Sequence, residues 1–271
     1  MDRVLVVMPC YNERENLGRI IPEVLEVVGG VDLLIIDDGS PDGSGAVAQE
    51  WADRETRVRV IHREGKQGLG TAYIVGFRQA LEDGYDAVIQ MDADLSHTPA
   101  VIPWLLANLP EGGIVVGSRY LGGIRILNWP LVRLFLSVAA RWYVRLITGM
   151  PLSDPTSGFT CIDRSALAAV DLGRLHSNGY SFLTELKYVL WRHGCPMREF
   201  PIVFCDRTDG RSKMSGAIIF EALWRTWLLR LRWRQGDRRY GSVEPAAWVP
   251  RRTQTVFDPP QPPVGIEKSA G

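Results

Sequence analysis

Four apolar residues lead directly into two carboxylates and a glycine turn in the segment Leu33-Leu34-Ile35-Ile36-Asp37-Asp38-Gly39-Ser40-Pro41-Asp42-Gly43. A short apolar run bounded by Asp and Gly is typical of a strand that is buried on both faces. The Ser, Pro and Asp that follow supply the cap oxygen and the early proline with which helices begin. The segment therefore predicts a strand, a tight turn and a helix, with Asp37 and Asp38 at the carboxyl end of the strand.

The same alternation of strand and helix patterns continues to about Gly117. Apolar runs rich in β-branched residues predict strands at Val4–Met8, Leu33–Ile36, Val58–Ile61, Ala87–Met91 and Ile114–Val116. Helical spacing predicts helices at Glu15–Val28, Gly43–Asp53, Leu69–Glu82 and Pro99–Asn108. Strands that alternate with helices indicate an α/β fold with a Rossmann-like, mainly parallel sheet flanked by helices. In such sheets, ligands bind at the carboxyl ends of the strands.

The composition is that of a single, charge-balanced domain. The chain has 271 residues, which is long enough for one sizeable α/β domain. Its 31 basic and 31 acidic side chains argue against a general nucleic-acid binder. The four cysteines are isolated, without the spacing of a metal site, and are expected to be buried, reduced thiols. The first apolar run is too short for the core of a signal peptide, so none is expected.

After Gly123 the sequence changes character. Two amphipathic segments, Ile124–Ile147 and Gly216–Trp233, are rich in large apolar residues but are interrupted by arginines. Neither has the ~20 uninterrupted apolar residues that a membrane span requires, so no transmembrane helix is expected. Both suit amphipathic helices that lie in a bilayer interface, and packing of their apolar stripes on the core is an equal alternative. Residues 235–271 are rich in proline and lack apolar periodicity, which predicts a disordered tail.

Two carboxylates follow the fourth predicted strand in the segment Gln90-Met91-Asp92-Ala93-Asp94-Leu95-Ser96-His97. Alternation along a strand places Asp92 and Asp94 on the same side of the chain. Two like charges this close are costly unless a cation lies beside them, and Mg²⁺ or Mn²⁺ suits carboxylate and phosphate oxygens. Such a metal would offset the charge of a departing nucleoside diphosphate. His97 is interpreted as a helix-start residue or a donor to a ligand rather than as a base.

Further polar side chains follow the first and second strands. Tyr11 can stack on a nucleotide base and Glu13 can hydrogen-bond a ribose, although Asn-Glu is also an ordinary helix start. Asp37 and Asp38 suit the recognition of a base or a ribose hydroxyl, and a turn capped by aspartates is the alternative. The glycines of the loop Gly65–Gly70 either let the backbone approach a ligand or belong to a plain loop.

Cationic side chains mark a candidate anion site. Arg119 follows the fifth strand, while Arg133 and Ser137 are four residues apart and share one face of a helix. Together they could hold a phosphate by forked hydrogen bonds. In the later loop Asp206–Lys213, Arg207 and Lys213 could close over a diphosphate, and a solvated basic loop is the alternative.

The ordered set of motifs resembles a known family. The motifs are Pro9…Tyr11-Asn12-Glu13-Arg14-Glu15-Asn16, Asp37-Asp38-Gly39-Ser40-Pro41-Asp42-Gly43, Gly68-Leu69-Gly70-Thr71-Ala72-Tyr73, Met91-Asp92-Ala93-Asp94-Leu95-Ser96-His97, Gly117-Ser118-Arg119-Tyr120 and Arg207…Gly210-Arg211-Ser212-Lys213. Over about residues 3 to 225, the sequence resembles the dolichol- or polyprenol-phosphate mannose synthases, inverting enzymes of glycosyltransferase family 2 with a GT-A fold. Single motifs are shared by many relatives, but their ordered combination is specific.

The resemblance implies GDP-mannose as donor, polyprenyl phosphate in a membrane as acceptor, a divalent metal and a peripheral location at the cytoplasmic face. Its nucleotide contacts would be Pro9, Tyr11, Glu13, Ile35 and Asp37, and its metal and diphosphate motif would be Asp92, Ala93 and Asp94. Arg119, Arg207 and Lys213 would hold phosphates and, with Asp94, assist catalysis. Arg133 and Ser137 would receive the acceptor phosphate beside Arg119.

The resemblance also implies a division of the chain. Residues 1–234 would form the glycosyltransferase domain, with a nucleotide-binding half at about 1–117 and an acceptor- and membrane-facing half at about 118–234. The sequence departs from the family at Thr160, where Arg is usual, and it lacks the transmembrane hairpins of some relatives. A separate integral-membrane partner could therefore anchor it.

Other functions stay open at this point. One keeps the fold but uses UDP-glucose with polyprenyl phosphate, or a non-lipid acceptor. Another is a non-catalytic adaptor recruited to a membrane through its basic helices, against which the complete set of acidic and basic motif residues argues. A Rossmann oxidoreductase is disfavoured because no GxGxxG follows the first strand.

Overall fold

The computed structural model describes residues 3–27, 30–177, 179–205, 224–231 and 254–255. One sheet runs through the molecule in the strand order β10-β8-β5-β7-β4-β1-β2-β3. Its strands are β1 (Val4–Cys10), β2 (Val31–Asp37), β3 (Val58–His62), β4 (Ala87–Gln90), β5 (Ile114–Ser118), β7 (Thr160–Asp163), β8 (Met197–Pro201) and β10 (Gln254–Thr255). A second, two-stranded sheet pairs β6 (Ile126–Leu127) with β9 (Phe204–Cys205).

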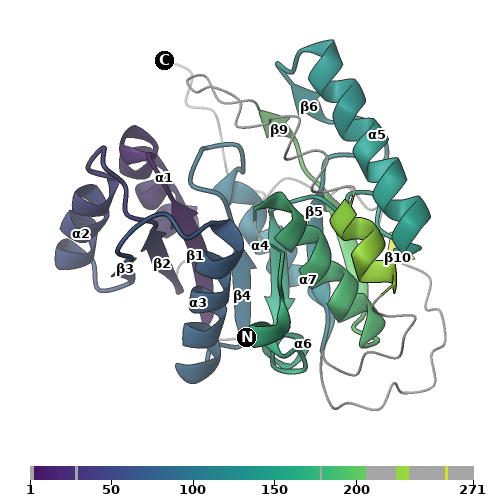
Figure 1. Ribbon diagram of the computed structural model, residues 1–271. Coiled ribbons are helices and arrows are strands. Elements are labelled where there is room, and N and C mark those ends of the chain that lie inside the picture. The colour runs from purple at the N-terminus through teal and green to yellow at the C-terminus, as the bar shows by residue number, and fades with distance from the viewer. Residues whose placement is uncertain (1–2, 28–29, 178, 206–223, 232–253, 256–271) are drawn as a thin grey trace, which may run out of the picture.

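Helices cover both faces of the large sheet (Figure 1). They are α1 (Arg14–Val27), α2 (Ser44–Arg54), α3 (Leu69–Glu82), α4 (Ile102–Ala107), α5 (Leu131–Thr148), α6 (Arg164–Ala168) and α7 (Tyr180–Arg192), with short 3-10 turns η1 (Pro99–Val101) and η2 (Leu172–Arg174). Alternate residues of β1 enter opposite cores: Val7 packs with α3, α6 and α7, and Val6 packs with α1 and α4. The sheet is therefore buried on both faces, as the apolar runs predict.

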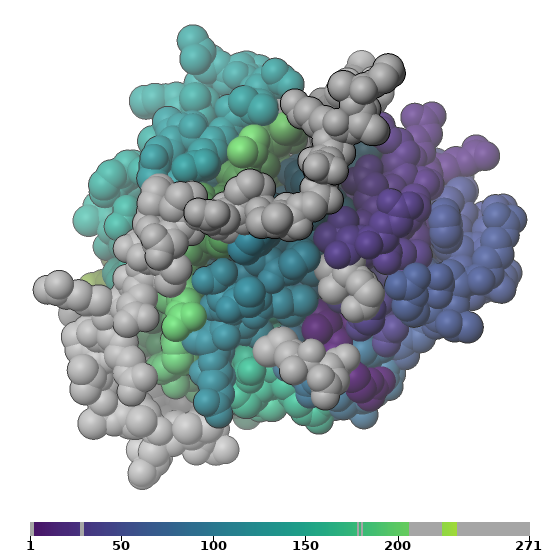
Figure 2. Space-filling view, turned by 180° about the vertical axis from the view of Figure 1, so that it is seen from behind, coloured from purple at the N-terminus to yellow at the C-terminus, as the bar shows by residue number. Residues whose placement is uncertain are grey.

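The parallel part of the sheet lies in the half of the chain for which the sequence predicts nucleotide binding. Strands β3, β2, β1 and β4 are all parallel, so their carboxyl ends meet at one edge. The five predicted strands and four predicted helices are all present with end shifts of a few residues, and β7 enters antiparallel between β4 and β5. Seen from behind, this half and the later half of the chain lie side by side (Figure 2).

One detail of the fourth strand differs from the expectation. The strand ends at Gln90, so Asp92 and Asp94 lie in the following loop and not on the strand itself. The amide of Met91 still donates to Val7, and the chain then turns through Leu95, which has a φ of 62°. Strand alternation therefore does not set the positions of the two aspartates. Their own hydrogen bonds do so instead, as described below.

The structure bears on the first amphipathic segment after Gly123, which the sequence predicts to be either an interface helix or a helix packed on the core. Helix α5 buries only Val144, Ile147 and Thr148. It exposes large apolar side chains along most of its length: Leu131, Val132, Phe135, Leu136, Trp142 and Leu146. Figure 1 shows α5 beside β6 and β9, at the far end of the molecule from α2. Its apolar stripe is thus largely uncovered among the described residues, which favours an interface helix over a core helix.

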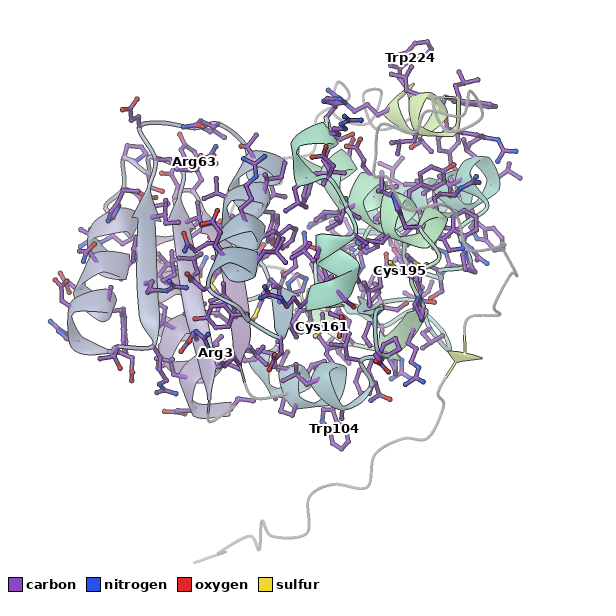
Figure 3. All side chains as sticks on the ribbon, turned by 90° about the horizontal axis from the view of Figure 1, so that it is seen from below. Arg3, Arg63, Trp104, Cys161, Cys195 and Trp224 are labelled. Carbon is purple, nitrogen blue, oxygen red and sulfur yellow. The ribbon has the colours of Figure 1, made fainter. Side chains whose placement is uncertain are left out.

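The second amphipathic segment is described only over residues 224–231, which are helical. Leu229 is buried in the core, and the guanidinium of Arg230 donates to the carbonyl of Ile147 at the end of α5. Trp224 and Trp227 are exposed, and Trp224 points away from the body of the molecule (Figure 3). In the predicted tail, only residues 254–255 are described, and they pair with β8 as β10.

No helix in the described part of the chain is long and apolar enough to span a bilayer.

We expect Gly76→Ala to destabilise the protein, although alanine is the better helix former. A methyl at Gly76 in α3 would overlap with Val7 Cγ1 on β1. Overpacking of this kind costs about 1–3 kcal/mol, which exceeds the roughly 1 kcal/mol that helix propensity contributes. Gly18 in α1 has open space at the same place, so Gly18→Ala is the matched control and should raise the free energy of unfolding. Urea unfolding measures both variants, and changes of the same sign would contradict the close packing of α3 on β1.

Candidate active site

The carboxyl ends of β1 and β2 carry the residues predicted to contact a nucleotide. Tyr11 is half-buried, and the ammonium of Lys66 lies 4.1 Å from the centre of its ring. The backbone amide of Glu13 donates to Ser44 Oγ (2.8 Å), and its carboxylate accepts from Asn16 Nδ2 (2.7 Å). Tyr11 and Glu13 thus lie together at the carboxyl edge of the sheet, where the sequence predicts them. Lys66, from the loop before α3, also contacts Tyr11, although no pattern in the sequence assigns it a role.

The two aspartates after β2 have different surroundings. Asp37 accepts from the amide of Ser40 (3.2 Å) and lies 3.8 Å from His62 Nδ1. Asp38 accepts from the amides of Gln67 (3.0 Å) and Gly68 (2.9 Å) and pairs with Arg63 at 2.8 Å; Arg63 is labelled in Figure 3. Asp38 therefore holds the loop before α3, whereas Asp37, which is equally buried, is tied to the turn after β2.

Glycines let this loop pack against the turn after β2. Gly39 has a φ of 72°, and a Cβ there would lie 2.6 Å from the Cα of Gly65. Gly70, at the start of α3, comes similarly close to the segment before α7, because a Cβ there would lie 2.8 Å from the carbonyl oxygen of Ser177. Packing within the protein thus explains why Gly39 and Gly70 are glycines, without a contact between the backbone and a ligand.

The three apolar residues among the predicted donor contacts are all buried. Ile35 is fully buried in the core between the sheet and α1, Pro9 is buried in β1, and Ala93 is 3% exposed. Any contact of Ile35 or Pro9 with a nucleotide therefore has to come from the backbone. A sequence pattern can locate a residue near the carboxyl edge of the sheet, but it does not tell whether a contact would come from its backbone or from its side chain.

The acidic motif after β4 is held by its own hydrogen bonds. The backbone amide of Asp92 donates to His97 Nδ1 (3.2 Å), and Asp92 Oδ1 accepts from the phenol of Tyr73 (3.3 Å). Asp94 is 6% exposed, and its Oδ1 accepts from the amide of Ser96 (3.0 Å). Both carboxylates are thereby fixed within the same short loop at the carboxyl edge of the sheet.

His97 has a structural position beneath this loop. Its ring stacks on Phe159 with centroids 4.9 Å apart, and burial lowers its pKa, against the nearby charge of Asp92. A neutral imidazole that accepts at Nδ1 carries its proton on Nε2. His97 therefore supports the backbone of Asp92, in keeping with its interpretation as a residue other than the base.

The donor set suits a hard divalent ion that takes the rest of its ligands from outside the chain. Asp92 and Asp94 offer carboxylate oxygens, and no group of three or more His, Cys, Asp or Glu side chains within the described residues could hold a metal alone. Mg²⁺ and Mn²⁺ are commonly bound by one or two carboxylates together with phosphate oxygens and water. The residues present therefore fit a metal that binds together with a diphosphate.

Arg119, at the end of β5, is paired with a carboxylate that the sequence analysis did not connect to it. Its Nε and one terminal nitrogen donate to the two oxygens of Asp154 at 2.7 and 2.8 Å. Asp154 is fully buried. Burial opposes both charges, but their mutual attraction raises the pKa of Arg119 and lowers that of Asp154. The guanidinium is thus anchored on one side, which limits the directions in which it can meet a phosphate.

The loop of Asp154 is anchored from two further elements. Glu199 on β8 accepts from the amide of Ser153 (2.7 Å) and the amide of Asp154 (3.0 Å). Lys187 on α7, 1% exposed, donates from Nζ to the carbonyl of Ser157 (2.6 Å). Burial lowers the pKa of Lys187 to about 7, against the attraction of Asp154. Lys187 brings a buried basic group to the loop that leads to Thr160, the position where the family usually has arginine.

Two of the three predicted acceptor-phosphate residues, Arg119 and Ser137, meet around Tyr120. Its phenol donates to Ser137 Oγ on α5 (2.7 Å), and the guanidinium carbon of Arg119 lies 5.5 Å from its ring centre. Arg133, one turn before Ser137, lies 4.2 Å from the ring centre of Trp129. The structure therefore brings Arg119 and Ser137 to the same side chain. Arg207 and Lys213 lie outside the described residues.

Comparison with known proteins identifies the family. Residues 5–171 match the family model described as Glycosyl transferase family 2. The undecaprenyl-phosphate mannosyltransferase of Micrococcus luteus is 41% identical over 88% of this chain and 99% of its own length. The polyprenol monophosphomannose synthase of Mycolicibacterium smegmatis is 42% identical over 89% of this chain and 92% of its own length. The chain belongs to glycosyl transferase family 2.

Other relatives agree with this assignment. The dolichol-phosphate mannosyltransferase of Pyrococcus furiosus is 35% identical over 82% of this chain and 62% of its own length. The glucosyl-3-phosphoglycerate synthase of Mycobacterium tuberculosis, solved with Mn²⁺, UDP-glucose and phosphoglyceric acid, matches with a TM-score of 0.61 at 21% identity, over 84% of this chain and 79% of that chain. At that identity the likeness concerns the fold. The expected GT-A fold and the resemblance drawn from the motifs are both confirmed.

The buried lysine of this family 2 glycosyltransferase should give its stability a distinct pH dependence. Lys187 loses its proton near pH 7 in the folded state and near pH 10.5 in the unfolded state. Between these values the unfolded state binds more protons, so stability rises with pH, by at most about 1.4 kcal/mol per pH unit. Below pH 7 both states are protonated and this contribution is flat.

Urea unfolding of the wild type and Lys187→Met at pH 6 to 9 isolates the effect. The free energy of unfolding of the wild type should rise above pH 7 relative to that of the variant. Two parallel curves would show that Lys187 stays charged in the folded protein.

Proposed function

We propose that this glycosyltransferase moves mannose from GDP-mannose to a polyprenyl monophosphate, with inversion at the anomeric carbon and with a divalent metal. The observation that carries the proposal is the 41% and 42% identity, over nearly nine tenths of the chain, to two enzymes named for mannosyl transfer to polyprenyl phosphates. The site agrees with it, since a nucleotide edge, an acidic motif and a group of cationic and hydroxyl side chains follow one another along the sheet.

The donor occupies the carboxyl edge of β1, β2 and β4 in this proposal. Tyr11 stacks on the guanine, Glu13 and Asp37 bind the nucleoside, and the backbone at Pro9 and Ile35 lines the same edge. Asp38 shapes the edge through its hold on the loop before α3. Asp92 and Asp94 hold the Mg²⁺ or Mn²⁺, with Ala93 between them at the diphosphate. When bound, the metal offsets the negative charge of the leaving diphosphate.

The acceptor phosphate itself is the nucleophile. The second pKa of a phosphate monoester is about 6, so it is already ionised near neutral pH and needs no strong protein base. Arg133 and Ser137 on α5 receive it, and Arg119 lies beside the ring of Tyr120, whose hydroxyl contacts Ser137. Arg207 and Lys213 are assigned to the donor phosphates. The protein then acts by orienting the two substrates in line and by stabilising charge.

The exposed face of α5 positions the enzyme at the membrane that holds its acceptor. Leu131, Val132 and Phe135 are 82%, 73% and 71% exposed at the end of the helix that also carries Arg133 and Ser137. Arginines stack on the tryptophan of the same helix, Arg145 at 5.1 Å from the ring centre of Trp142. An apolar stripe edged by Arg and Trp is typical of a helix that lies in the bilayer interface. This stripe supports the proposed peripheral association with a membrane, which we assign to its cytoplasmic face, with a separate membrane partner as an additional anchor.

Transfer of radiolabelled mannose from GDP-mannose into an organic-extractable lipid tests the proposal. We expect label in polyprenyl phosphate with Mg²⁺ or Mn²⁺, and none after addition of EDTA, because the diphosphate then lacks its counter-charge. Asp94→Ala should abolish the label. Label from UDP-glucose but not from GDP-mannose would keep the mechanism and overturn the sugar; label from neither donor would return weight to the adaptor alternative.

Charges on the exposed face of α5 should separate membrane binding from catalysis. Leu131→Glu with Phe135→Glu removes two large apolar contacts worth about 1.5–3 kcal/mol each, so binding to anionic liposomes should fall at least about 100-fold. Transfer to a short-chain, water-soluble polyprenyl phosphate should stay near the wild-type rate. Val27→Glu, at an exposed apolar site at the end of α1, is the matched control and should bind liposomes normally. Normal liposome binding by the double variant would contradict this orientation.

A further inference from the structure

The phenol of Tyr73 lies directly beneath the acidic motif. Tyr73 is 0% exposed on α3, and its hydroxyl donates to Asp92 Oδ1 at 3.3 Å. Its ring stacks with Phe77 (centroids 5.7 Å apart) and Phe182 of α7 (6.1 Å). A tyrosine fixed by two aromatic neighbours has little freedom, so its hydroxyl is held at one point under the carboxylate.

The sequence before Tyr73 explains how it reaches this place. Gly70 lies one turn earlier on α3, and a Cβ there would lie 2.8 Å from the carbonyl oxygen of Ser177 and 3.0 Å from Phe182 Cβ. Only glycine therefore lets the start of α3 approach α7 closely enough for the aromatic rings to stack. The segment Gly68-Leu69-Gly70-Thr71-Ala72-Tyr73, to which no role at the donor site was assigned, thus ends in a side chain that touches the metal motif.

The hydroxyl of Tyr73 can act only as a donor to Asp92. A carboxylate oxygen can only accept a hydrogen bond, so the phenol is the donor in this contact. Asp92 is also confined elsewhere, because its amide donates to His97 and a Cβ on Gly158 would lie 3.0 Å from its Oδ2. Tyr73 contributes the contact that sets the direction of the carboxylate from below.

We propose that Tyr73 is a positioning residue, which fixes the Asp92 carboxylate in the orientation needed to bind the metal of the donor complex. This inference rests on the proposed function, since it takes Asp92 as a metal-binding carboxylate. Carboxylates that bind metals are themselves hydrogen-bonded, and loss of such a partner typically costs 10–100-fold in metal affinity or activity. Because a phenylalanine keeps the aromatic stack, the hydroxyl can be removed without changing the packing.

The test compares Tyr73→Phe with a matched variant. Tyr85→Phe is suitable because Tyr85 is 3% exposed and its phenol donates to a carboxylate, Asp32, at the amino end of β2 and so at the opposite edge of the sheet. The dissociation constant of Mn²⁺ in the presence of GDP is measured by electron paramagnetic resonance, together with kcat, KM for the donor and the thermal midpoint. We expect about tenfold or weaker Mn²⁺ binding and a matching fall in kcat/KM for Tyr73→Phe, and wild-type Mn²⁺ binding for Tyr85→Phe.

The outcomes are distinct. Wild-type Mn²⁺ affinity and turnover in Tyr73→Phe would overturn the inference, and so would equal losses in both variants, which would indicate general destabilisation. If the wild type binds Mn²⁺ with GDP but transfers no mannose, the proposed function fails while the Mn²⁺ comparison still decides the role of Tyr73. If the wild type binds no Mn²⁺ in the presence of either GDP or UDP, both are overturned.

Discussion

The buried ion pair between Arg119 and Asp154 is the interaction on which the geometry of the site depends. It joins the end of β5 to the loop before β7, over 35 positions of sequence. Both charges are shielded from water, so loss of either partner would leave a buried charge uncompensated at a cost of about 3–5 kcal/mol. Glu199 from β8 and Lys187 from α7 hold the same loop. Four elements of the second half are thereby fixed relative to one another.

The loop held by this network lies between the proposed donor site and the proposed acceptor site. Gly158, in the loop held by this network, lies against Asp92, and Tyr120, next to Arg119, hydrogen-bonds Ser137 on α5. The buried charges are therefore next to both the acidic motif, which its own hydrogen bonds hold, and the proposed acceptor site. Helix α5 in turn carries both the proposed phosphate-binding residues and the exposed apolar face, so the proposed membrane contact and the proposed acceptor site belong to one element.

The parallel half of the fold could be predicted because its signals are local. Short apolar runs that end in Asp, Gly or Pro mark the strands, and parallel strands place the residues after them, such as Tyr11 and Asp37, at one edge. The antiparallel strand β7 and the strand β8 were not predicted. Strand β7 has only Cys161 and Ile162 as apolar residues, and β8, with Arg198 and Glu199, is not an apolar run. Their places in the sheet follow from long-range pairing.

The partners of the site residues also escaped the sequence. Nothing local in the sequence connects Asp154 with Arg119, and Lys187 lies in an ordinary helical pattern. Tyr73 was recognisable as the end of a motif, whereas its contact with Asp92 depends on the packing of α3 against α7. Patterns thus locate the groups that meet a ligand, and tertiary packing supplies the groups that orient them.

A crystal structure of the protein soaked with Mn²⁺ and GDP-mannose tests the proposed positions of nucleotide, metal and sugar most directly. We expect guanine against Tyr11, Mn²⁺ bound by Asp92 and Asp94 together with the diphosphate, and the mannose directed toward Ser137. A nucleotide bound away from the carboxyl edge of β1 and β2, or a metal that touches neither carboxylate, would contradict these positions.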